Sequence, residues 1–399
     1  MIDGDAYLPV TTNPAYVTAT MPDDGSSVFP TALVVDEARG INWEGGAASF
    51  IDGLASDYSD MQVTLADGET PVPFGVEEFS QLYGSRKIVA HMGIPSLSAS
   101  TITELLLWRG IPGGPHEDRN GVYANSDGYC GVWPLNEQNI GAPGGTGTDV
   151  YADWTGNTSP GKDYVSNMGK DGVIGKGQQF SGTTSGGTDR IVVPYSSNLD
   201  TPNAITISLW VYPLSDGDGA SVIECITGRD SINKKGWMIF QGGRSYDELR
   251  VMMYYAPEIG SWMDFRITDV FSMNIWTHVA ITYKYVGMGT SIVATYVNGQ
   301  QVFYRNDRNG PLTSYNNDLW IGAREYTGSE NYFDGAIDDL QLHRVARSEN
   351  WIKTNYNISI NNSVFWTIGE EVIFTTRFPA AHRSKNFKMG PKLVYVGGK

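Results

Sequence analysis

The sequence predicts an all-β fold, with two β-sandwich domains in tandem and a short β-rich tail at the C-terminus. Short runs of alternating apolar and polar residues recur along the 399-residue chain, separated by turn-forming Gly, Pro, Asp and Ser. The 47 glycines, 22 tyrosines and 11 tryptophans are typical of a loop-rich β protein. The length is sufficient for two or three domains that each bury a core.

Residues 1–128 are predicted to form the first sandwich. Five runs in this part have the length and composition of strands, and each is bounded by Gly, Pro, Asp or Ser. They are Phe29–Asp36, Asp60–Leu65, Thr70–Phe79, Lys87–Pro95 and Thr101–Trp108.

Residues 129–358 are predicted to form the second sandwich. Its clearest part is Asn274–Arg347, where three alternating runs rich in Val, Ile, Tyr and Trp are separated by Gly-Met-Gly, Asn-Gly and Gly-Ala-Arg. The order of the pieces resembles the laminin-G-like, concanavalin A-type jelly roll, which implies that fold for this domain. The pieces are the strands Arg190–Pro194 and Ile205–Pro213, the Trp276-x-His278 strand, Val297-Asn298-Gly299, Trp320-Ile321-Gly322, and Gly335-x-Ile337-Asp338-Asp339.

The first domain resembles a domain of unknown function that directly precedes laminin-G-like domains in many prokaryotic surface proteins. The resemblance rests on the Phe29-Pro30 strand and on the ending Gly131-Val132-Trp133-Pro134-Leu135-Asn136-Glu137. Leu107-Trp108-Arg109-Gly110 departs from the usual Tyr-Tyr-Gly ending of its penultimate strand. The two resemblances together cover roughly residues 8–370.

Two motifs suggest a cation site in the second domain. Asp153-Trp154-Thr155-Gly156-Asn157 is either an Asx-type turn or half of such a site. Period-two alternation over Gly335–His343 places Asp338 on the face of Leu340 and Leu342, so we expect this carboxylate at the edge of the core, where it needs a partner.

Oxygen ligands of this kind suit Ca²⁺. In laminin-G-like relatives a calcium ion often lies near these two motifs, so the resemblance implies a structural Ca²⁺ site at Asp153, Asn157 and Asp338. The alternative is that Asp338 accepts backbone N–H groups from the long loop 138–176.

No catalytic grouping is recognised in the sequence. The five histidines are scattered and have no metal-ligand spacing. The pairs Glu77-Glu78 and Asp338-Asp339 are adjacent in strands, so their side chains point to opposite faces and cannot act together across one glycosidic bond. We expect no enzyme activity.

Aromatic residues in the variable stretches of the second domain are the candidate ligand contacts. Sandwich faces hold sugars with aromatic rings and with Asp, Asn and Arg side chains. The stretches 229–235, 241–247, 254–262 and 304–315 contain the residues that we expect to bind a glycan: Tyr254, Tyr255, Trp262 and Tyr315. With 47 aromatic residues in the chain, most build cores.

Charge is distributed unevenly. The chain has 28 Lys and Arg residues and 44 Asp and Glu residues, which gives a net charge of −16. This negative charge disfavours nucleic acid as a partner. Residues 359–399 are predicted to form an assembly tail with strand-like runs at Val372–Thr376 and Lys392–Val396. From Val372 onward the tail has no acidic residue, and its basic residues are Arg377, Arg383, Lys385, Lys388, Lys392 and Lys399.

Targeting signals are not recognised either. The N-terminal stretch is acidic and polar, and no apolar run is long enough to cross a bilayer, so we expect neither signal-peptide export nor membrane insertion. Cys130 and Cys225 lie in different predicted regions, and we expect two buried free thiols rather than a disulfide.

Three hypotheses follow for the function. The first is a non-enzymatic bacteriophage virion protein, assembled in the host cytoplasm as a capsid decoration, head-fibre or tail-associated (tail fibre) protein. Its partners would be other virion proteins or copies of itself, and its laminin-G-like domain would bind a glycan for adhesion. The second is a bacterial cell-surface adhesin or an extracellular carbohydrate-binding module, and the third is a glycoside hydrolase.

Overall fold

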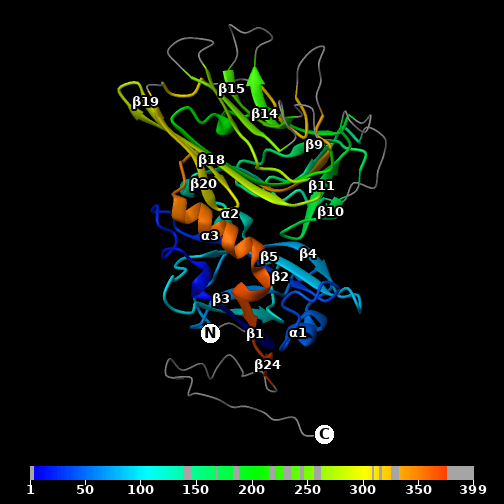
Figure 1. The fold of residues 1–399 in the computed structure, drawn as a ribbon. Coiled ribbons are helices and arrows are strands. Elements are labelled where there is room, and N and C mark those ends of the chain that lie inside the picture. Colours follow the sequence, from blue (N-terminus) through cyan, green and yellow to red (C-terminus); the bar gives the residue numbers. More distant parts are fainter. Residues whose placement is uncertain are drawn as a thin grey trace.

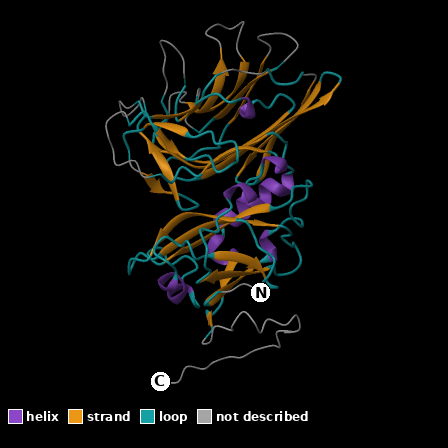
Figure 2. Cartoon of the chain, turned by 180° about the vertical axis from the view of Figure 1, so that it is seen from behind, coloured by secondary structure: helices purple, strands orange, loops and turns teal. Residues whose placement is uncertain are grey.

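A computed structural model places most of the chain in two stacked sandwiches of β-strands (Figure 1). Seen from behind, helices lie between the two sets of strands (Figure 2). This confirms the predicted all-β class. The structure describes residues 4–137, 145–167, 169–182, 188–215, 221–227, 235–242, 247–255, 262–307, 310–313, 317–324 and 332–374.

The N-terminal sandwich consists of two antiparallel sheets. One has the strand order β23-β1-β6-β3, with β24 also paired to β1, and the other has the order β2-β5-β4. The five strands predicted for this domain are β2 to β6, and β2 has the predicted bounds. The elements are β1 Ala6–Thr12, β2 Phe29–Asp36, α1 Ala47–Gly53, β3 Gln62–Leu65, β4 Phe74–Ser80, β5 Lys87–Ile94, β6 Glu104–Arg109, α2 Arg119–Val122, β23 Trp366–Ile368 and β24 Val372–Ile373.

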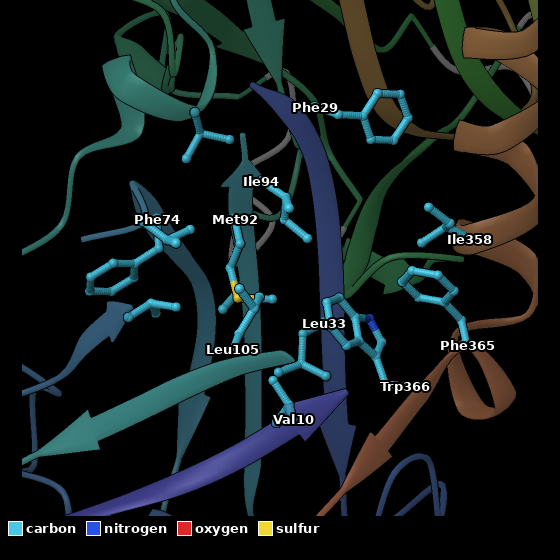
Figure 3. Packing of buried hydrophobic residues seen from close by; sticks show 14 of the residues in the cluster. Val10, Phe29, Leu33, Phe74, Met92, Ile94, Leu105, Ile358, Phe365 and Trp366 are labelled. Atoms are coloured by element: carbon cyan, nitrogen blue, oxygen red, sulfur yellow. The ribbon is translucent and has the colours of Figure 1, made fainter. Parts of the chain in front are cut away.

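The core of this sandwich forms where the inward faces of its two sheets meet. Val10 and Leu105 from one sheet approach Leu33 and Met92 from the other, with Trp366 beside them (Figure 3). All five side chains are almost completely removed from solvent. Burial of apolar surface of this kind is the main stabilising contribution to such a domain.

The end of the described chain returns to the N-terminal sandwich. Val10 pairs with Ile368, and Ala6 pairs with Ile373. Part of the segment that we assigned to a separate tail, residues 366–373, therefore completes the first sheet. Residues 359–365 of the predicted tail are helical or lie between helices, and residues 375–399, including the run Lys392–Val396, lie outside the described residues.

The second sandwich has two long sheets. We call β10-β11-β22-β13-β18-β19-β20, with β7 paired to β22, the inner sheet, and β17-β16-β15-β14-β21-β12-β9-β8 the outer sheet. The strands are β7 Tyr129–Trp133, β8 Asp149–Tyr151, β9 Gly161–Tyr164, β10 Gly169–Asp171, β11 Lys176–Phe180, β12 Arg190–Val193, β13 Ala204–Pro213, β14 Ser221–Thr227, β15 Lys235–Gln241, β16 Leu249–Tyr254, β17 Trp262–Ile267, β18 Thr277–Gly287, β19 Thr290–Val297, β20 Gln300–Asp307, β21 Leu319–Ile321 and β22 Gly335–His343. Cys130 in β7 is a buried free thiol, as expected.

A helix that the strand patterns did not indicate joins the two sandwiches. α3 (Glu349–Ile360) begins at Ser348, whose hydroxyl accepts the Trp351 N–H at 3.0 Å, and α4 (Asn362–Phe365) follows it. Trp351 and Ile358 are buried in the same apolar cluster as Tyr296 of the inner sheet and the N-terminal core. The N-terminal core therefore extends through α3 to the inner sheet, and the second sandwich has a separate core between its own two sheets. Among the helices of the described residues, none is long and apolar enough to span a membrane.

Candidate functional site

The outer sheet has one face that points away from the core, and we consider it as the candidate ligand surface. The middle of this face, with Met238, Phe240, Met252 and Tyr254, is buried. β14 and β15 lie at the end of the molecule away from the N-terminal sandwich (Figure 1). Alternate residues of each strand enter the core, such as Trp237 and Ile239 of β15, so the residues between them point outward. We call these residues the outer face: Lys162, Tyr164, Arg190, Val192, Met238, Phe240, Arg250, Met252, Tyr254, Trp262, Asp264, Arg266 and Trp320.

Trp262 is the exposed aromatic ring at the β17 edge of this face. It pairs across the strands with Tyr254, and the two rings lie 6.4 Å apart at 40°. Trp262 is 49% exposed, whereas Tyr254 is 2% exposed. The indole therefore presents a flat apolar surface to solvent, and Tyr254 supports it from the neighbouring strand.

Polar groups stand beside this ring. The guanidinium of Arg250 donates two hydrogen bonds to the carboxylate of Asp264, from Nε at 2.9 Å and from Nη2 at 2.6 Å. Both side chains retain about a quarter of their exposure, 25% and 26%. Arg266 donates to Glu248 at 2.6 Å. A flat apolar ring next to a planar array of donors and acceptors is the composition of a site for a polyhydroxylated ligand.

The four predicted ligand contacts do not all meet here. Tyr254 and Trp262 lie side by side on the outer face. Tyr255 is half-buried, forms a bridge with Leu312 and packs against the core of the sandwich, so it lies on the core side of its strand. Tyr315 lies outside the described residues.

Asp153 closes a turn on its own backbone. Its Oδ1 accepts the N–H groups of Val132 and Thr155 at 3.1 and 3.0 Å, and its Oδ2 accepts the N–H of Ser159 at 3.0 Å. The amide of Asn157 donates to the carbonyl of Cys130 at 2.9 Å. This arrangement is the Asx-type turn that we gave as one interpretation of the motif.

Asp338 faces the N-terminal sandwich and not the core between the two sheets. Its neighbour Asp339 has a positive φ of 48°, and the register against β13 shifts between Ser208 and Trp210. Such a bulge places one extra residue in β22 and reverses the alternation. Ile337, Leu340 and Leu342 consequently share the core, so the predicted face of Asp338 was wrong.

The hydrogen bonds of Asp338 match the alternative to a metal. Its Oδ2 accepts the N–H groups of Val173 and Ile174 at 2.7 and 3.1 Å, and these residues end the long loop. Its Oδ1 is buried without a partner. Burial raises the pKa of this carboxyl well above its ordinary range, and Glu77 and Asp339 raise it further.

The calcium site stays a prediction, and the three residues do not fit it as a shared ligand set. The oxygens of Asp153 already accept backbone hydrogen bonds, and Asp338 bonds to another segment. Among the described residues no group of three His, Cys, Asp or Glu side chains is arranged to hold a metal. If Ca²⁺ is bound, a chelator should lower the melting temperature. An unchanged melting curve with EDTA, also after refolding without calcium, would remove the proposal.

The adjacent carboxylate pairs, Glu77-Glu78 and Asp338-Asp339, lie at the contact between the two sandwiches. Glu77 accepts the Lys176 N–H at 3.3 Å, and its other oxygen lies 2.7 Å from Nε2 of His91. Burial lowers the pKa of His91 to about 4 and raises that of Glu77 well above its ordinary range, to which Glu78 and Asp339 also contribute. These groups are buried, so they connect the domains and do not flank an open groove.

Several residues of the outer face were not recognised in the sequence. Tyr164, Arg190 and Trp320 lie on β9, β12 and β21, and Arg250 and Asp264 on β16 and β17. The alternation of each strand indicates that these side chains share a face, but it does not indicate which strands are neighbours. That information comes from the strand order of the sheet.

The two sheets of the second sandwich form a jelly-roll domain. Residues 185–353 match the laminin-G-like family model described as the concanavalin A-like lectin/glucanases superfamily. Among curated proteins, none matches the chain in sequence.

Solved structures resemble the chain over about half of its length. The binding domain of Paraclostridial Mosquitocidal Protein 1 is 18% identical, with a TM-score of 0.43, over 59% of this chain and 53% of that domain. The chain thus spans about half the length of that toxin domain. Domain 4 of AbnA, an extracellular arabinanase from Geobacillus stearothermophilus solved with arabinotriose, is 22% identical, with a TM-score of 0.36, over 51% of this chain and 90% of that domain.

Proposed function

We propose that this protein is a non-catalytic carbohydrate-binding protein, and that the outer face of its second sandwich holds the glycan. The half-exposed indole of Trp262, supported by Tyr254 and flanked by the Arg250–Asp264 pair, is the observation that carries the proposal. The match of residues 185–353 to a family model described as the concanavalin A-like lectin/glucanases superfamily supports it.

The geometry suits a sugar better than an apolar ligand. An aromatic ring packs against the C–H groups on one face of a pyranose, while the guanidinium and carboxylate can exchange hydrogen bonds with its hydroxyls. Both polar side chains are already paired, so they are held in place before a ligand arrives. A preordered site loses less conformational entropy on binding.

Trp262→Ala should abolish most glycan binding. The variant removes the exposed ring and leaves the strand pairing of β17 in place. Loss of a central aromatic contact weakens binding by about 2 kcal/mol or more, roughly thirtyfold in Kd. The measurement is a glycan array with the wild type, followed by titration calorimetry of the best ligand with both proteins.

Tyr83→Ala is the matched control for this experiment. Tyr83 is 82% exposed and belongs to the other sandwich, so its loss removes an aromatic ring far from the outer face. We expect its binding to equal that of the wild type. Equal binding by the Trp262 variant, or a wild type that binds no glycan, would contradict the proposal.

The proposed role involves binding without hydrolysis. The carboxylate pairs Glu77-Glu78 and Asp338-Asp339 lie at the contact between the sandwiches, and Asp264 is engaged with Arg250. Hydrolysis needs two carboxyl groups on either side of one glycosidic bond. Release of reducing sugar from a bound glycan would contradict the non-catalytic role and show that the protein is a glycoside hydrolase.

We further propose that the protein acts on the surface of a bacteriophage virion, where it presents the glycan-binding face. The support is the charge asymmetry of the chain: its net charge is −16, yet the segment after Glu371 has basic residues and no acidic ones. Such a segment suits docking onto an acidic neighbour or onto another copy. Mass spectrometry and labelling of purified particles would locate it, and a cell-surface location without particles would favour the adhesin.

A further inference from the structure

Arg190 lies between two aromatic rings at the other end of the outer face. Its strand, β12, runs between β9 and β21. The guanidinium carbon lies 4.6 Å from the ring centre of Tyr164 on β9 and 5.2 Å from that of Trp320 on β21. Rings over a guanidinium fix its plane by cation–π attraction and leave its N–H edges for hydrogen bonds.

Those edges are incompletely used. Nη1 donates to the carbonyl of Thr188 at 3.2 Å, whereas Nε is buried and has no hydrogen-bond partner. Among the described residues no carboxylate lies within ion-pair distance of Arg190, although the chain has an excess of acidic residues. In contrast, Arg250 and Arg266 on the same face are each paired with an acid.

A second cation accompanies Arg190. Lys162 lies on the same face of β9, two residues from Tyr164, and Val192 is its partner in β12. Its other cross-strand neighbour is Asp149, which is exposed and forms no ion pair with it. This part of the outer face therefore has two positive charges next to two aromatic rings, with Trp320 shared between it and the centre of the sheet.

We propose that Arg190 binds the carboxylate of an acidic saccharide, such as a uronic acid or a sialic acid residue. The inference rests on the proposed glycan-binding function and assigns its ligand class. Carboxylate oxygens match the planar N–H edge of a guanidinium, and Lys162 adds charge attraction. Tyr164 and Trp320 provide the aromatic surface for the sugar ring.

The test compares acidic glycans with their methyl esters. An array of uronate and sialoside oligosaccharides, each printed beside its methyl ester and beside neutral and sulfated glycans, is probed with the wild type and with Arg190→Gln. We expect acidic glycans to bind and esterification to weaken binding at least about tenfold, as loss of a charge-assisted hydrogen bond does. Arg190→Gln should weaken binding of the acid to the level of the ester and leave the ester unchanged.

Two further variants control for charge and folding. Lys284→Gln removes an exposed cation from the inner sheet and should bind acidic glycans like the wild type. Arg190→Lys keeps the charge but loses the planar edge, so we expect partial binding. Melting curves establish that each variant is folded.

Each remaining result overturns the inference in a different way. Equal binding of acids and esters, still dependent on Trp262, would retain glycan binding and reject the carboxylate site. If Arg190→Gln still bound acidic glycans like the wild type, Arg190 would not be the residue that binds the carboxylate. Arg190-dependent binding of sulfated glycans alone would reject the carboxylate as the ligand, and an array without any binding would reject the proposed function together with this inference.

Discussion

Trp366→Ala is expected to lower the free energy of unfolding by about 4 kcal/mol, as large-to-small substitutions of buried tryptophan do. Trp366 is 1% exposed and lies in the core of the N-terminal sandwich (Figure 3). Its indole N–H donates to the carbonyl of Ala32 in β2 at 2.9 Å. The variant therefore leaves a cavity and removes one of two side-chain hydrogen bonds to this carbonyl, which keeps the bond from the Asn362 amide at 2.7 Å. Urea denaturation monitored by circular dichroism measures the change.

Thr367→Ala on the same strand is the matched control. Thr367 is exposed and pairs with Thr11 through its backbone only. We expect a loss below about 1 kcal/mol, the full range of strand propensity. If both variants unfolded at the same urea concentration, β23 would not contribute to the N-terminal core.

Arg347→Met is expected to destabilise the protein by about 3 kcal/mol, since removal of one partner of a buried ion pair leaves the other without compensation. The side chain of Arg347 is 1% exposed and pairs with Asp24, which is 19% exposed. It also donates to Ser26 at 2.8 Å and to the carbonyl of Asp127 at 2.6 Å. The loss falls at the lower end of the known range because water can reach Asp24. Chemical denaturation again provides the measurement.

The neighbouring arginine is the control for this variant. Arg344 is exposed, and its guanidinium donates only one long hydrogen bond, to the carbonyl of Asn198 at 3.4 Å. Arg344→Met should change the free energy of unfolding by less than about 0.5 kcal/mol, as surface substitutions do. A loss in Arg347→Met no larger than this would mean that the segment around Asp24 is not held by the second sandwich.

Local pattern was sufficient for most of the strands. Phe29–Asp36 was predicted with the same bounds as β2, because the turn residues on both sides of the run mark where the strand begins and ends. The pattern failed over Gly335–His343, where the bulge at Asp339 reverses the alternation and turns Asp338 away from the core. A bulge depends on the register of two strands, which no single strand encodes.

Only some residues of the candidate site could be predicted from the sequence. Trp262 and Tyr254 were predicted as ligand contacts from the aromatic residues of the variable stretches. Arg190 was not, because an arginine in a strand is informative only when its neighbours are known. Tyr164 and Trp320 are far from it along the chain, and sheet pairing brings all three together.

The sequence by itself determined the all-β class, the two sandwiches and the laminin-G-like resemblance of the second, because strand periodicity and turn residues act over a few positions. The tertiary structure alone decided that β23 and β24 complete the first sheet, that α3 packs between the N-terminal core and the inner sheet, and that the outer face combines Trp262 with Arg190. These features depend on contacts between segments distant in the chain, which form only when the whole apolar surface is buried at once.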